Sequence, residues 1–176
     1  MSDTPLVHLE RMTAGHVEQT WRWLQDAALR RAIDCIEPPA REGNAAYWQA
    51  KFVDLSREDY AIVHRAAGHV GNAGLHSIDH ARRKAELWIY LGTQRGQGIG
   101  ASAVALLLRR GFGALDLNRI ALRVLADNIP AQRLYAKFGF VEEGRGREDT
   151  VMEGAVVDAV WYGLLRRDYA QRQSVS

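Results

Sequence analysis

The chain has 176 residues, with 23 Lys and Arg, 21 Asp and Glu, and a formal net charge of +2. Hydrophobic residues make up 47% of it and charged residues 25%, which excludes a disordered chain, a collagen and a disulfide-rich scaffold. The mild charge favours no nucleic-acid partner. No apolar run approaches the ~20 residues of a membrane span, so we also expect no membrane partner.

Neither the cysteine content nor the N-terminus indicates export. The single cysteine, Cys35, cannot form a disulfide within the chain. Residues 1–5 have neither the basic start nor the apolar segment of a signal peptide. We therefore expect a cytoplasmic protein that forms one domain over residues 1–176.

The N-terminal third predicts a strand and two helices. Alternating apolar residues favour a strand over residues 6–12. Thr13 can cap a helix that extends to about Leu29. Two adjacent prolines make residues 34–41 a loop, and a second helix is expected over residues 43–55.

The rest of the chain alternates between strand and helix patterns. A helix is expected over residues 101–113, and Asn128 can cap another that ends at Gly139. Strands are expected over residues 60–64, 69–76, 85–91, 119–125, 140–147 and 155–164. This order predicts a mixed α/β fold, in which helices cover both faces of the central sheet.

A glycine-rich segment lies between a strand and a helix, and reads Arg95-Gly96-Gln97-Gly98-Ile99-Gly100. Amide groups at a helix start are unpaired and carry the positive end of the helix dipole. Glycines allow a phosphate to approach such a backbone closely. The spacing fits neither the P-loop nor the dinucleotide fingerprint. We predict a phosphate-binding loop, and the alternative is a flexible strand-to-helix turn.

Two motifs together resemble a known family. Residues 95–100 resemble the acyl-CoA pyrophosphate loop, Q/R-x-x-G-x-G/A, of the GNAT-type N-acetyltransferases. Residues 128–140 are similar to that family's second signature, N-x-x-A-x-x-L-Y-x-x-x-G-F. The resemblance implies a mostly antiparallel central sheet whose middle strands splay apart, with acetyl-CoA as cosubstrate and no metal.

Further segments are similar to one branch of that family, which contains ribosomal-protein alanine, polyamine and amino-sugar acetyltransferases. These segments are residues 71–79, residues 85–87 and the tail between Glu143 and Asp158. Trp88 departs from the branch, in which a glycine before the tyrosine is common.

The resemblance divides the chain into an acceptor side at residues 13–60 and an acyl-CoA-binding core at residues 85–140. It implies that acetyl-CoA is bound by Ile89, Leu91, Gln94, Arg95, Gly96, Gln97, Gly98, Ile99, Gly100, Ala101, Asn128, Ala131 and Arg133.

Three residues are candidates for catalysis. The family's motif places Tyr135 near the CoA sulfur as general acid, and the alternative is a core tyrosine on an apolar helix stripe. Glu86 is a candidate base, and the alternative is a carboxylate paired with an arginine. His76 titrates in a suitable range, and the alternative is an exposed histidine at a strand end.

The acceptor side is rich in aromatic residues. Trp21 fits a core stripe, and Trp23 lies ~200° away on the helix. We therefore expect Trp23 to face a cleft, another chain or solvent, and stacking on a sugar or nucleobase of the acceptor is one use for it. The implied activity is acetyl transfer to a primary amine of a small molecule, with an amino sugar or sugar nucleotide slightly favoured, or to a protein N-terminus. The alternative is a non-catalytic acyl-CoA sensor or a partner-binding module. A homodimer is common among such proteins.

Overall fold

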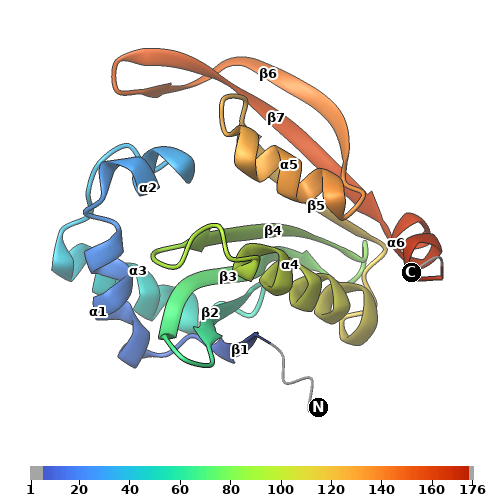
Figure 1. Ribbon diagram of the computed structural model, residues 1–176, viewed down its shortest axis with the longest axis horizontal. Helices are drawn as coiled ribbons and strands as arrows, with labels where there is room; N and C mark the ends of the chain where they lie inside the picture. Colours follow the sequence, from blue (N-terminus) through green and yellow to red (C-terminus); the bar gives the residue numbers. More distant parts are fainter. Residues whose placement is uncertain (1–5, 175–176) are drawn as a thin grey trace.

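The computed structural model describes residues 6–174, which build a seven-stranded sheet in the order β1-β2-β3-β4-β5-β7-β6 (Figure 1). The strands are β1 Val7–Arg11, β2 Glu58–His64, β3 Gly68–Asp79, β4 Lys84–Leu91, β5 Arg119–Leu125, β6 Val141–Met152 and β7 Ala155–Leu165. Neighbouring strands are antiparallel except for the parallel pair of β4 and β5. The mixed, mostly antiparallel sheet predicted from the sequence is confirmed.

Helices cover both faces of this sheet. They are α1 Ala14–Trp23, α2 Ala27–Ala32, α3 Arg41–Phe52, α4 Ile99–Arg109, the π-helical turn η1 Arg110–Ala114, α5 Ile129–Lys137 and α6 Arg166–Gln173. The main core lies where α4 and α5 pack on the sheet, and it includes Leu75, Leu107 and Tyr135. A smaller core under α1 and α3 contains Met12 and Trp48.

The two faces of β4 differ in character because its side chains alternate. Residues directly opposite each other in an antiparallel pair point to the same face. Glu86 lies opposite His76, and Tyr90 lies opposite Asn72, so these side chains share the face under α1 and α3. Leu87 points to the other face and is buried. The predicted alternation of β4 is confirmed.

The sheet opens in its middle. β4 and β5 pair only from Lys84 with Arg119 to Glu86 with Ala121. Beyond Glu86 the two strands diverge, so the edge of β4 that faces β5 has no strand partner. The splayed central strands that the family resemblance implied are present.

Some predicted boundaries are wrong. The helix predicted to reach Leu29 breaks after Trp23, because the side chain of Asp26 accepts a hydrogen bond from the amide of Ala28 (2.9 Å) and starts α2. The helix predicted from residue 101 begins at Ile99, and the strand predicted to end at residue 147 continues to Met152. Helix α6 was not predicted.

Candidate active site

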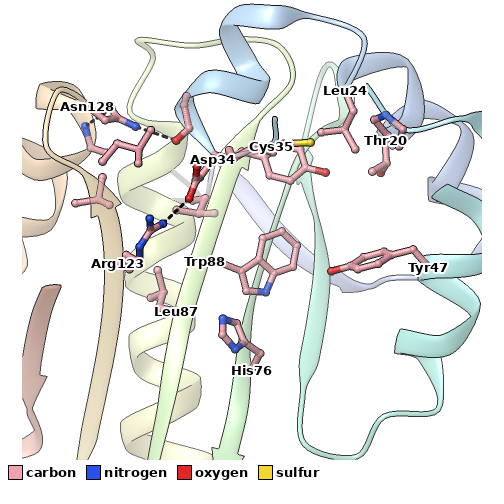
Figure 2. Close-up of a pocket in the computed structure, with 18 of the residues that line it drawn as sticks. Thr20, Leu24, Asp34, Cys35, Tyr47, His76, Leu87, Trp88, Arg123 and Asn128 are labelled. Carbon is pink, nitrogen blue, oxygen red and sulfur yellow. Dashed lines mark hydrogen bonds and ion pairs between the residues drawn. The ribbon is translucent and has the colours of Figure 1, made fainter. Parts of the chain in front are cut away.

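A cavity of about 780 Å³ lies in the gap between the diverging ends of β4 and β5. Helices α1 and α3 close one side, α5 closes another, and the segment between α2 and α3 passes over it (Figure 2). The sequence motifs therefore meet at one place, because the gap brings the residues after Glu86 close to the start of α5.

Five of the residues predicted from the sequence line this cavity, namely His76, Ile89, Asn128, Ala131 and Tyr135. Leu91, the glycine loop, Arg133 and Glu86 do not line it, although Glu86 lies opposite His76 on β3. The structure thus brings the candidate acid and one candidate base together.

Tyr135 projects from α5 and has only 6% of its surface exposed. Its ring meets that of Phe140 edge-on, with 5.7 Å between centroids. Burial raises the pKa of Tyr135 to about 12, so the phenol keeps its proton at neutral pH. The side chain both packs in the core and reaches the cavity, so the two readings of this tyrosine are compatible.

His76 is half-buried on the cavity wall, so the alternative of an exposed strand-end histidine is wrong. Burial lowers the pKa of His76, and the nearby Glu86 carboxylate opposes that shift. Its Nδ1 lies 3.0 Å from the Ser77 hydroxyl. Within residues 6–174, Glu86 forms no ion pair with an arginine. Because burial lowers its pKa, His76 is neutral at pH 7 and can accept a proton.

The glycine loop forms an open turn before α4. Gly96 and Gly98 have φ angles of +82° and +76°, and a Cβ at either position would meet nothing within 4 Å. Gly98 is the N-cap of α4 and offers no capping side chain, so the first amides of that helix remain available to a ligand. Arg95 points back, 3.6 Å from the Asp26 carboxylate.

Gly92 shows why the prediction for Trp23 is wrong. A Cβ at Gly92 would lie 2.0 Å from the Trp23 ring, which is therefore buried beneath the start of the loop. Trp21 is the partly exposed indole, and its Nε1 donates a hydrogen bond to the Pro39 carbonyl (3.0 Å). The close approach of two distant segments decided which indole is buried.

Asn128 caps α5, since its side chain accepts a hydrogen bond from the amide of Ala131 (3.2 Å). Its Nδ2 also donates to the carbonyl of Ala32 in α2 (3.1 Å). Arg133 is exposed on the next turn and, across the described part of the chain, forms no ion pair. Asn128 lines the cavity and Arg133 does not, and the binding of acetyl-CoA by either residue stays a prediction.

Sequence reasoning missed Asp34 and Arg123. The Asp34 carboxylate accepts hydrogen bonds from Arg123 (2.7 Å) and from the Thr150 hydroxyl (3.0 Å), and it joins the segment above the cavity to β5 and β6. The available signal was Arg123, a charged side chain inside the strand 119–125, whose other interior residues are apolar.

Within residues 6–174, no group of three or more His, Cys, Asp or Glu could hold a metal ion. No helix of that range is long and apolar enough to cross a membrane.

Residues 7–141 match the model of the acetyltransferase (GNAT) domain. The chain belongs to the GNAT acetyltransferase family. YdaF of Bacillus subtilis, named as a ribosomal N-acetyltransferase, is 29% identical over 123 residues, which cover 69% of this chain and 67% of YdaF. The spermidine N(1)-acetyltransferase of Vibrio cholerae is 31% identical over 120 residues, which cover 68% of this chain and 69% of that one.

Solved structures agree with this GNAT assignment. The crystal structure of the Vibrio cholerae spermidine N-acetyltransferase with CoA and spermine has a TM-score of 0.88 and 22% identity, and the match covers 94% of this chain and 98% of that chain. This likeness shows that the fold is shared. The GNAT protein described here is an N-acetyltransferase that uses acetyl-CoA as its cosubstrate.

Proposed function

We propose that this enzyme transfers an acetyl group from acetyl-CoA directly to a primary amine inside the cavity between β4 and β5. The observation that carries this proposal is the position of Tyr135, which is buried and reaches the gap that follows the last β4–β5 pair at Glu86. The open edge of β4 offers backbone groups to an amide-bearing arm, and the glycine loop follows directly on the same strand.

The diphosphate would bind at the start of α4. The residues from Gln94 to Ala101 combine an open left-handed turn with the unpaired amides and positive dipole end of a helix. Ile89 and Leu91 would line the path of the arm along β4. Arg133 would offer a free guanidinium to a more distant phosphate.

Acetyl-CoA supplies a thioester carbon for the amine nitrogen to attack. A new C–N bond forms, the C–S bond breaks, and the two protons lost by the incoming ammonium go to the base and to the departing sulfur. His76 lies on the cavity wall in its neutral form and would take the first proton directly or through water, with Glu86 beside it as the second candidate.

Tyr135 would act on the departing sulfur. Burial raises the pKa of Tyr135 above the usual value of a phenol, so its hydroxyl holds its proton firmly beside the departing thiolate. Tyr135 therefore donates a hydrogen bond that stabilises the thiolate, and the proton finally comes from the amine. Burial raises the pKa of the Cys35 thiol, which makes Cys35 a poor nucleophile and favours direct transfer.

The acceptor is proposed to be a small-molecule amine, with an amino sugar or sugar nucleotide favoured, and a protein N-terminus as the second class. The names of two relatives support both classes, since one is named as a ribosomal N-acetyltransferase and the other for the small-molecule amine spermidine. Aromatic cavity walls, which include Tyr47 and Trp88, support a ring-bearing acceptor.

The test is release of free CoA thiol from acetyl-CoA in the presence of amines of each class. We expect amine-dependent release with at least one class. Tight CoA binding without release with any amine would favour the alternative, a non-catalytic acyl-CoA sensor. The division into an acceptor side at residues 13–60 and an acyl-CoA core at residues 85–140, the cytoplasmic location and the homodimer stay predictions.

A further inference from the structure

We infer that the cavity selects an amine with a single positive charge on a ring-shaped body, that Tyr47 and Trp88 form the slot for the ring, and that polyamines are poor acceptors. This inference rests on the proposed acetyl transfer and specifies its substrate class. It separates the enzyme from its structural neighbour, which was crystallised with spermine.

Two aromatic side chains from different elements face the same cavity. Tyr47 comes from α3 with half of its surface exposed, and Trp88 comes from β4. Figure 2 shows the Tyr47 hydroxyl pointing across the cavity toward Trp88, with His76 below them. A ring held between them would place its amino group close to the candidate base.

A third aromatic residue holds these two in place. Trp48 is only 3% exposed, and its ring lies 5.5 Å from that of Tyr47 and 6.2 Å from that of Trp88. The Tyr47 ring is nearly perpendicular to it, at 87°. The walls are therefore fixed by packing before any acceptor binds, which lowers the entropic cost of holding a flat ligand.

The cavity lining offers no free carboxylate to a polycation. Among the described residues that line it, Asp34 is the only carboxylate, and the two lining cations, Arg57 and Arg123, are both paired with acids. Asp34 already accepts hydrogen bonds from Arg123 and Thr150. The nearby Asp59 is held by Arg57 at 2.5 and 2.9 Å.

A polyamine carries an ammonium at each of its nitrogens, and no free carboxylate among the described lining residues would pair with its distal charges. The free-energy cost of removing an unpaired ammonium from water exceeds the stabilisation that a cation–π contact with an aromatic ring provides. A monoamine avoids this penalty, because its single ammonium must lose its proton to react. The walls then stabilise the ring.

Gly43 provides a way to reverse this preference. It lies on α3 at the cavity wall, and a Cβ built there would meet nothing within 4 Å. A glutamate at this helix position would place a carboxylate at the cavity without a steric clash, and it would replace a poor helix former. Gly43→Glu should therefore admit a second ammonium, and Gly43→Gln is the uncharged control.

The experiment compares kcat/KM for glucosamine, 2-phenylethylamine and spermidine at saturating acetyl-CoA. We expect kcat/KM for at least one ring monoamine to exceed kcat/KM for spermidine by about tenfold. That ratio is the scale of the penalty for one unpaired ammonium. Tyr47→Ala should lower kcat/KM for that monoamine by about tenfold without changing KM for acetyl-CoA. Leu55→Ala is the control for removal of an exposed apolar side chain outside the cavity, and it should leave both values unchanged.

Gly43→Glu, but not Gly43→Gln, should raise kcat/KM for spermidine. A wild-type preference for spermidine, or a Tyr47→Ala variant with an unchanged ring-amine rate, would overturn the inference alone. Absence of thiol release with every amine would overturn the proposed function, and the inference with it.

Discussion

The carboxylate of Asp34 accepts a hydrogen bond of 2.7 Å from the guanidinium of Arg123, 89 residues further along the chain. The same arginine binds Asp149 on β6 at 2.5 Å. Arg31 of α2 adds ion pairs to Asp127 and Glu153. These contacts tie the segment above the cavity to the opposite half of the sheet, so the cavity is enclosed by polar links between distant segments.

Asp34→Asn should loosen this enclosure while keeping a residue type that tolerates the left-handed φ of +56°. The loss of a charge-assisted bond to Arg123 should lower the free energy of unfolding by roughly 1–3 kcal/mol. Urea unfolding measures this change, and KM for the amine should rise. The exposed pair of Arg167 and Asp168 gives the control Asp168→Asn. Equal stabilities of the two variants would show that the link contributes nothing.

Tyr135→Phe should lower kcat by ~10²-fold, because the thiolate loses its hydrogen-bond donor while the ring keeps its packing. CoA affinity and stability should change little, since the hydroxyl group makes no other required contact. Steady-state kinetics and CoA titration separate these effects. A variant with the wild-type kcat would remove Tyr135 from the mechanism.

The pH dependence should report on His76. Because burial lowers the pKa of His76, its protonation limits the reaction only below about pH 6.5. Above that range, kcat/KM should level off, because the acceptor ammonium that gives its proton to His76 stays protonated up to a pKa of ~10.4 for an alkyl amine. His76→Gln should lower kcat/KM and abolish the acid limb. An unchanged profile in that variant would exclude His76 as the base.

Gly92→Ala should destabilise the fold, since the added Cβ would lie 2.0 Å from the Trp23 ring. Overpacking of this kind costs about 1–3 kcal/mol. Trp23→Leu in the same chain would make room and should recover part of that loss, which a double-mutant cycle measures. Strict additivity of the two single changes would contradict the direct contact.

The sequence was sufficient for features with local periodicity and insufficient for contacts between distant segments. The alternation of Glu86, Trp88 and Tyr90 followed from strand geometry alone. The helix break at Asp26 was missed because an apolar helical pattern continues through the capping residue. The burial of Trp23 instead of Trp21 depends on the close approach of Gly92, which no local pattern encodes.

In the site, too, residues in local motifs were predictable and contacts between distant segments were not. The paired motifs pointed to Tyr135, which lines the cavity between β4 and β5, and to the glycine loop, which does not line it, and the roles of both stay predictions. The link between Asp34 and Arg123 was not predictable, because neither residue lies in a motif and only the tertiary fold brings them together.

The central claim is that the amides at the start of α4 hold the diphosphate of CoA. Calorimetric titration with CoA tests it most directly in the wild type, in Gly98→Val and in Gly113→Ala. Gly98 has a φ of +76°, which valine strongly disfavours, whereas a Cβ at Gly113 meets nothing within 4 Å and its φ is negative. We predict at least ~10-fold weaker binding for Gly98→Val and unchanged binding for Gly113→Ala. Wild-type affinity in a folded Gly98→Val variant would contradict the account.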